Sequence, residues 1–152
     1  MKIKAIACTL LTVIGLFGCS SQNEPGTYQS KNFGFEFKYP DTWHVKEIEQ
    51  TILISPDPNF DTDNEMLGQN APIEIQISNQ SSINSIVENY NSTPEKTHIA
   101  NKKAEQISYE GLGQTFTVIS IANEDNFVEI WKNQTTEQAN QAFQQIYSSI
   151  KF

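Results

Sequence analysis

Five oxygen-bearing side chains alternate along residues 57–65 and could act together on a cation. They are Asp57, Asn59, Asp61, Asp63 and Glu65. Hard cations such as Ca²⁺ take about six to eight oxygen ligands, and alternating side chains on a curved loop can direct several oxygens to one ion. The EF-hand pattern is not met, because Thr62 and Gly68 occupy the positions of its glycine and its bidentate acid. We therefore expect either a solvated acidic loop or a weak Ca²⁺ site, and no other cofactor.

The two histidines, His44 and His98, are the remaining nitrogen donors. A nitrogen-rich metal site needs converging ligands, and neither histidine is followed by a second histidine or a cysteine two to four residues on. Both are predicted to be ordinary strand residues. The chain also contains no Gly-x-Ser-x-Gly nucleophile elbow and no glycine-rich phosphate loop. A hydrolase therefore remains an alternative function that no sequence motif supports, and we expect the protein not to be an enzyme.

Tyr39, Trp43 and Trp131 are the aromatic side chains that could line a ligand groove against a sheet. Aromatic residues at strand spacing more often belong to the core, where each buries about 150–250 Å². Tyrosine and tryptophan can still present a polar tip at the edge of a cleft. The sequence leaves both alternatives open: three core residues, or a groove that binds a small ligand.

The strongest chemical motif lies at Leu16–Ser20, after a basic and apolar N-terminus. Two lysines precede an apolar run at residues 5–17, which is shorter than the roughly 20 residues that span a bilayer but typical of a secretory signal. An aliphatic residue stands three positions before Cys19, and the small Gly18 stands directly before it. This pattern resembles a bacterial lipobox, in which cleavage requires a small residue before the cysteine and the thiol accepts a diacylglyceryl group.

The lipobox resemblance implies a lipoprotein precursor that loses residues 1–18 and starts at acylated Cys19. Two or three acyl chains anchor a protein stably where a single chain binds only marginally. The bilayer is then one partner, the location is the cell envelope, and Ser20 is compatible with export to the outer membrane of a Gram-negative cell. The alternative is an ordinary cleaved signal in which Cys19 has no role.

The composition excludes several classes of partner and site. The chain has 10 lysines, no arginine and 18 acidic residues; residues 1–18 contain two of the lysines and no acid, so 8 lysines against 18 acids give the mature chain a charge of −10. Nucleic acid is a poor partner for such a chain, because binding needs neutralised phosphates and arginine contacts. Cys8 leaves with the signal and Cys19 is capped, so disulfides and cysteine metal sites are excluded from the folded body.

The elements that must position these residues are mostly strands. Residues 19–30 are polar and are predicted to form the lipidated N-terminus and a tether. Aromatic residues then alternate with other residues over 33–39, which predicts a strand that ends at Pro40. Further strands are expected at 43–48, 51–55, 73–78, on both sides of a turn at 101–102 within 97–111, and at 114–122 and 127–132.

Two helices complete the expected elements. Ser81 or Ser82 is predicted to cap a helix with apolar residues at helical spacing: Ile83, Ile86, Val87 and Tyr90. Thr135, with Gln138 three residues later, is predicted to form a capping box at the start of the last helix. Successive strands joined by short turns favour an antiparallel sheet. The fold class is therefore α+β, with one mostly antiparallel sheet and helices on its faces.

Several of these segments together resemble PsbP-like domains. The segment "GFEFKYPDTW" resembles the start of such domains, "HIANKKAEQISYEG" their strand-turn-strand, "TFTVISIANEDNFVEIW" their long hairpin, and "AFQQIYSSIKF" their closing helix. Asn101 departs from the family, where glycine is common in that turn. The resemblance covers roughly residues 28–152 and implies an α/β/α sandwich, a fold shared with a photosystem II extrinsic subunit and a Ran-binding import factor. It also implies accessory or binding roles, usually without catalysis.

Three functions follow as hypotheses for a single domain at residues 31–152. The first is a lipid-anchored, non-catalytic accessory module that binds an envelope protein. The second is a small-ligand binder that uses an aromatic groove. The third is an envelope hydrolase, which no motif of the sequence supports.

Overall fold

The computed structural model describes residues 24–60 and 71–152, and it places seven strands in one antiparallel sheet. The order of the strands is β3-β4-β5-β9-β8-β7-β6, so β3 and β6 are the two edges. The bounds are β3 His44–Ile48, β4 Thr51–Ser55, β5 Ile73–Ser78, β6 Glu95–Ile99, β7 Lys102–Gly111, β8 Gln114–Asn123 and β9 Asn126–Lys132. The predicted α+β class with a mostly antiparallel sheet is confirmed.

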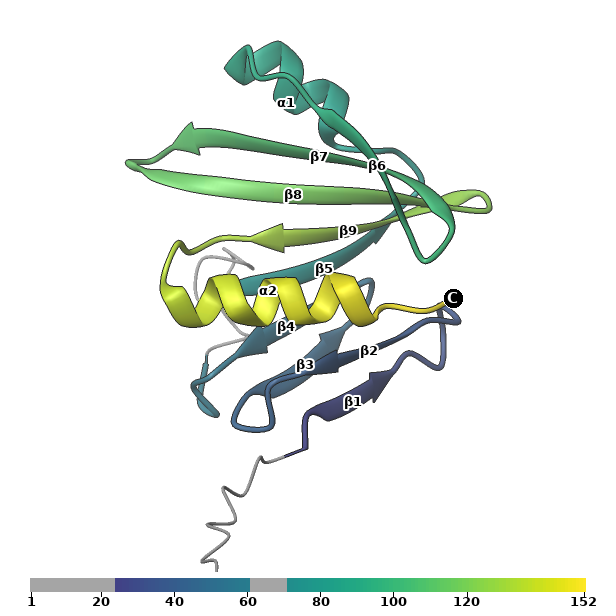
Figure 1. The fold of residues 1–152 in the computed structure, drawn as a ribbon, viewed down its shortest axis with the longest axis vertical. Helices are drawn as coiled ribbons and strands as arrows, with labels where there is room; N and C mark the ends of the chain where they lie inside the picture. The colour runs from purple at the N-terminus through teal and green to yellow at the C-terminus, as the bar shows by residue number, and fades with distance from the viewer. Residues whose placement is uncertain (1–23, 61–70) are drawn as a thin grey trace, which may run out of the picture.

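The two faces of this sheet are covered differently (Figure 1). One face, here called the inner face, is covered by helix α2 (Glu137–Ser149) and by a separate two-stranded sheet, β1 (Gly26–Gln29) with β2 (Glu36–Tyr39). Helix α1 (Ile83–Tyr90) packs on the opposite face, here called the outer face. Strand alternation separates the two faces, since neighbouring residues of one strand point to opposite sides.

The inner face holds the main core. Strand β5 contributes Ile73, Ile75 and Ile77, and α2 contributes an apolar stripe in which Ala139, Ala142 and Ile146 are fully buried. The predicted stripe of the last helix is thus confirmed. Phe35 and Phe37 complete the cluster, with Phe37 fully buried and its ring centroid 5.1 Å from that of Tyr28 in β1. The alternating aromatic residues are therefore core residues first.

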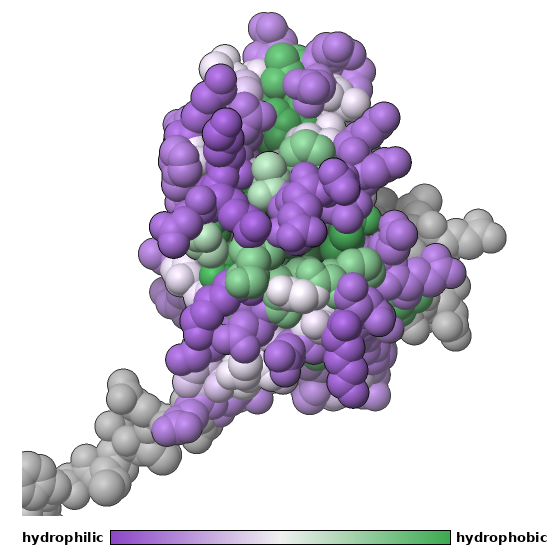
Figure 2. Space-filling model, turned by 90° about the vertical axis from the view of Figure 1, so that its right-hand side faces the viewer, coloured by the Kyte–Doolittle hydropathy of each residue, from purple (hydrophilic) through white to green (hydrophobic). Residues whose placement is uncertain are grey.

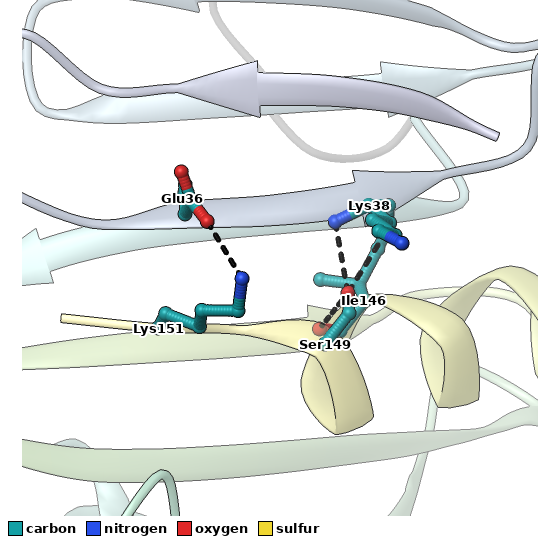
Figure 3. Close-up of polar contacts among 5 residues, drawn as sticks. All are labelled: Glu36, Lys38, Ile146, Ser149 and Lys151. Carbon is teal, nitrogen blue, oxygen red and sulfur yellow. Dashed lines mark hydrogen bonds and ion pairs between the residues drawn. The ribbon is translucent and has the colours of Figure 1, made fainter.

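The end of α2 fastens β2 to the rest of the domain (Figure 3). The backbone N–H groups of Glu36 and Lys151 each donate to the other residue's carbonyl at 2.9 Å, and the Lys151 Nζ lies 3.0 Å from Glu36 Oε1. Two residues earlier, the Ser149 Oγ accepts a hydrogen bond from the Lys38 N–H at 2.8 Å and donates to the Ile146 carbonyl. The last turn of α2 thus supplies partners to a strand more than 100 residues earlier in sequence.

The predicted tether requires a correction, because residues 26–29 form strand β1. This strand pairs with β2 in the register Gly26↔Tyr39 to Gln29↔Glu36, and Tyr28 packs against the main core. Gly26 permits the pairing, since a Cβ at this position would lie 2.5 Å from the Tyr39 ring. A single apolar side chain within a polar segment gave no sign of a strand in the sequence.

Other predicted boundaries also shift. The aromatic strand begins at Glu36 and not at Phe33, because Gly34 has a φ of 67° and turns the chain before it. Helix α2 is capped by Thr136, whose Oγ1 accepts from the Ala139 N–H at 3.1 Å, so the capping box predicted at Thr135 is wrong by one residue. The β6–β7 turn consists of Ala100 and Asn101, with φ values of 49° and 65°, which are typical of a type I′ turn.

No helix in the described part of the chain is both long enough and apolar enough to cross a membrane.

Candidate functional site

The outer face is covered by two separate apolar clusters. Ile83 and Ile86 of α1 pack on Ile107 of β7 and Val118 of β8. Leu53 of β4 forms a second cluster on this face with Phe60 and Ala71, nearer the β3 edge of the sheet. Polar residues of the central strands lie between and beside these clusters, which makes the outer face the place to look for a functional site.

The buried carboxylate of Glu129 fixes the start of α1 on this face. Glu129 is only 1% exposed, and its Oε1 accepts from the Ser82 N–H at 2.7 Å and from the Ser82 Oγ at 3.0 Å. Ser82 is the N-cap residue, as one of the two predicted alternatives, but its side chain caps no helix N–H. A carboxylate at this end of a helix also interacts favourably with the helix dipole.

Ser81 connects this cap to the floor of a cleft. The Ser81 Oγ donates to the Ser120 Oγ at 2.9 Å and accepts weakly from the Ile83 N–H at 3.3 Å. Ser120 is buried beside Glu129, its direct neighbour in the β8–β9 register. The segment before α1 therefore lies across the sheet at β8 and β9, and it forms one wall of the cleft.

The cleft has a volume of about 390 Å³ and is lined mainly by side chains of the outer face. Cross-strand pairing brings these side chains together: Lys96 lies opposite Glu105, and His98 lies opposite Lys103. Glu105 in turn lies opposite Ser120. The residues that line the cleft are Ser81, Lys96, Thr97, His98, Lys103, Ala104, Glu105, Ser120, Ala122 and Phe127.

The three aromatic residues proposed for a ligand groove lie apart. Trp43 is 6% exposed and belongs to the inner-face core, against which Tyr39 packs. Trp131 lies at the edge of the α1 cluster on the outer face. Trp43 and Trp131 therefore lie on opposite faces of the sheet and cannot line one groove together. The indole N–H of Trp131 is buried without an acceptor among the described residues.

The acidic segment is described only at its start. Asp57 Oδ1 accepts from the Asn59 N–H at 2.9 Å, a local turn, and both residues are exposed. Asp61, Asp63 and Glu65 lie outside the described residues, as do Gly18 and Cys19. In the described ranges no three His, Cys, Asp or Glu side chains group as metal ligands. His44 and His98 stand on the two opposite edge strands, so they cannot share a metal ion.

Glu74 is a second buried carboxylate of the outer face. It is 4% exposed, and burial raises its pKa above the ordinary value, while hydrogen bonds from the side chains of Gln76 and Asn133 act in the opposite direction. The Gln76 Nε2 donates to it at 2.7 Å. Because folding raises this pKa, ionised Glu74 lowers stability at neutral pH, and this effect disappears as the pH falls below the value for the unfolded chain.

Among the residues that line the cleft, the sequence singled out His98 as a possible metal ligand, Ser81 as a helix cap and Phe127 as one of the aromatic residues that could line a pocket. The signal for the rest was present in "EKTHIANKK", since alternation over 95–99 places Lys96 and His98 on one face. The turn predicted at residues 101–102 would have placed His98 opposite Glu105. The observed turn, one residue earlier, places it opposite Lys103.

Comparison with known proteins supports the fold. No protein-family model and no curated protein matches the sequence. Among solved structures, the chain is similar to the solution structure of cyanobacterial PsbP (CyanoP) from Synechocystis, with a TM-score of 0.50 at 10% sequence identity. The similarity covers 90% of this chain and 97% of the cyanobacterial protein. The chain therefore has a PsbP-like fold, as the sequence resemblance predicted.

The Glu129 cap yields a testable prediction. Replacing Glu129 by alanine leaves the Ser82 N–H and the Ser82 hydroxyl without their acceptor, so we expect a loss of about 1–3 kcal/mol in the free energy of unfolding. Urea unfolding measures the loss, and hydrogen exchange should accelerate at residues 82 and 83. Glu129→Gln retains an acceptor oxygen and should cost less than Glu129→Ala. Equal stability of wild type and Glu129→Ala, or of the two variants, would contradict this role.

Proposed function

We propose that the protein is a lipoprotein of the bacterial cell envelope, whose PsbP-like domain is a non-catalytic accessory module that binds a partner protein. The observation that carries the proposal is the motif at Leu16–Ser20, in which Gly18 and Cys19 follow a signal-like segment. In this proposal Cys19 carries the acyl chains and residues 1–18 are removed. In a Gram-negative cell the anchor lies in the outer membrane.

The position of β1 limits how far the domain can stand from the bilayer. Strand β1 begins at Gly26, seven residues after Cys19. A fully extended chain spans at most about 3.6 Å per residue, so the anchor and the domain are at most about 25 Å apart. Such a short connection supports an accessory role at the membrane surface, next to other envelope proteins.

The PsbP-like fold supports a binding role over a catalytic one. The resemblance of the sequence to PsbP-like domains implies an accessory or binding role. The carboxylate nearest to the serine hydroxyls of the cleft belongs to Glu129, and it is engaged as the cap of α1. The local chemistry therefore favours a structural role for that acid, and the hydrolase remains the weaker alternative.

A hydrophobic surface near the C-terminus fits a protein partner. A hollow of about 550 Å³ has an apolar part formed by Phe33, Gly34, Ala100 and Phe152 and a polar part formed by Asn101, Lys102, Asn123 and Glu124. Phe152 is 36% exposed, and the Lys102 Nζ lies 4.9 Å from its ring centroid. Figure 2 views this end of the molecule and shows hydrophobic side chains in a band across its middle, bordered by hydrophilic ones. Exposed apolar patches rimmed by polar residues are typical of interaction surfaces.

The anchoring part of the proposal is tested by metabolic labelling with a fatty acid. The chain contains only two cysteines, Cys8 and Cys19. We expect the wild type and the control variant Cys8→Ala to incorporate label, because acylation requires only the Cys19 thiol. The variant Cys19→Ala should incorporate none. Label that persists in Cys19→Ala, or a wild type without label, would contradict the anchor.

The partner part is tested by co-purification from the native envelope after mild cross-linking. We expect one envelope protein to co-purify in stoichiometric amount with the wild type and with the control variant Leu112→Ser. Leu112 is 88% exposed, lies on the β7–β8 turn and does not line the hollow near Phe152. The variant Phe33→Ser/Phe152→Ser should recover at least about tenfold less of the partner, because central apolar contacts carry most of the binding energy. Recovery of the protein alone, or equal recovery with both variants, would count against this role.

A further inference from the structure

The side chains that line the cleft beside the start of α1 carry a net positive charge on an otherwise acidic protein. Lys96 and Lys103 contribute two positive charges and Glu105 one negative charge, which leaves +1 for the lining when His98 is counted as neutral. The buried carboxylate of Glu129 lies behind this lining and is engaged by Ser82. The whole chain carries a net charge of −8. A local reversal of sign at a concave site raises the concentration of anions there.

The two lysines of the cleft are also unengaged. Elsewhere, Lys46 donates to the Phe60 carbonyl at 2.8 Å, Lys132 to Asn140 Oδ1 at 2.6 Å, and Lys151 to Glu36. The ammonium groups of Lys96 and Lys103 form no hydrogen bond or ion pair with any residue of the ranges 24–60 and 71–152. Each ammonium has three donors and no acceptor, so an oxyanion is the ligand that suits a pair of them.

The floor of the cleft adds a polar donor and an apolar wall. Ser120 is 4% exposed, and its Oγ accepts from Ser81 at 2.9 Å. Its own proton has no acceptor among the described residues, so it can be donated to a ligand. Ala122 and Phe127, which are paired across β8 and β9, supply the apolar surface. Ligand pockets commonly combine an apolar wall with a few polar groups in this way.

The size of the cleft favours a small molecule over a peptide. Pockets for small ligands measure about 300–1,000 Å³. At about 390 Å³, the cleft stands near the lower end of that range. An extended acidic peptide would need a groove that continues along a sheet edge or between elements.

We propose that this cleft is a binding site for a small organic anion. Its carboxylate or phosphate group is held by the ammonium groups of Lys96 and Lys103 and by the Ser120 hydroxyl, and its apolar part lies against Ala122 and Phe127. The site is independent of the anchor at Cys19 and of the partner surface near Phe152. An unacylated protein would bind the anion equally well.

The test is calorimetric titration of the full-length protein in detergent micelles at low ionic strength, because salt screens such contacts. Phenyl phosphate and benzoate serve as the two anionic probes and separate the phosphate and carboxylate arms. Benzyl alcohol serves as the neutral control. We expect saturable binding of at least one anion at millimolar concentration or below, and none of benzyl alcohol.

Three variants connect the binding to this cleft. Lys96→Gln/Lys103→Gln should weaken binding at least about tenfold, since it removes two charged donors. The matched control Lys31→Gln/Lys38→Gln removes the same charge from two exposed lysines outside the cleft and should change affinity less than about twofold. Glu105→Gln should tighten binding, because it removes the negative charge from the cleft.

Three results would overturn the proposal. They are no saturation by either anion, equal binding of benzyl alcohol, and equal losses in the two double-lysine variants. Glu105→Gln gives a gain of affinity that a poorly folded protein could not produce, so the proposal does not depend on a loss alone. Failure of fatty-acid labelling at Cys19 would leave all of these results unchanged, which keeps the two proposals separable.

Discussion

The placement of β2 beside α2 is the constraint on which the rest of the structure depends. Strand β2 pairs with β1 and not with the main sheet, so it stays in position through its aromatic side chains and through the end of α2. The reciprocal backbone pair between Glu36 and Lys151 joins β2 to the residues that follow α2. Without β2 and the residue directly before it, the inner face would lose Phe37 and Phe35, two of its largest buried side chains. Strand β1 is therefore connected to the core through β2 and the last turn of α2.

The outer face holds the cleft, and a different set of contacts positions its elements. The single helix of that face is positioned by one buried carboxylate, Glu129, and its N-terminal approach crosses the sheet at Ser120. The cleft lies between this segment and the side chains of β6 and β7 that point to the outer face. Its lysines come from β6 and β7 at the edge of the sheet, where side chains reach solvent without loss of core packing. The inner face thus contains the main apolar core, whereas the outer face carries the charged and polar side chains of the cleft.

Local patterns were sufficient to predict the inner face and helix α1, but not the contacts that form the cleft of the outer face. The alternation of Ile73, Ile75 and Ile77 and the spacing of Ala139, Ala142 and Ile146 each depend on a single element, and the structure confirms them. The Glu129 cap joins residues 47 positions apart, and no local pattern contains such a contact. The cleft depends on the register of one hairpin, and a one-residue error in its turn changes the partner of His98. Strand β1 was missed because its only apolar side chain, Tyr28, stands in a polar segment.

The central claim is that this PsbP-like domain is held at a membrane by its own N-terminal cysteine. Mass spectrometry of the mature N-terminal peptide, isolated from the membranes of the native cell, tests that claim most directly. The account predicts a peptide that starts at Cys19 and carries the mass of a diacylglyceryl group, with or without a third acyl chain. A mature chain that starts at any other residue, or an unmodified Cys19 thiol, would contradict it.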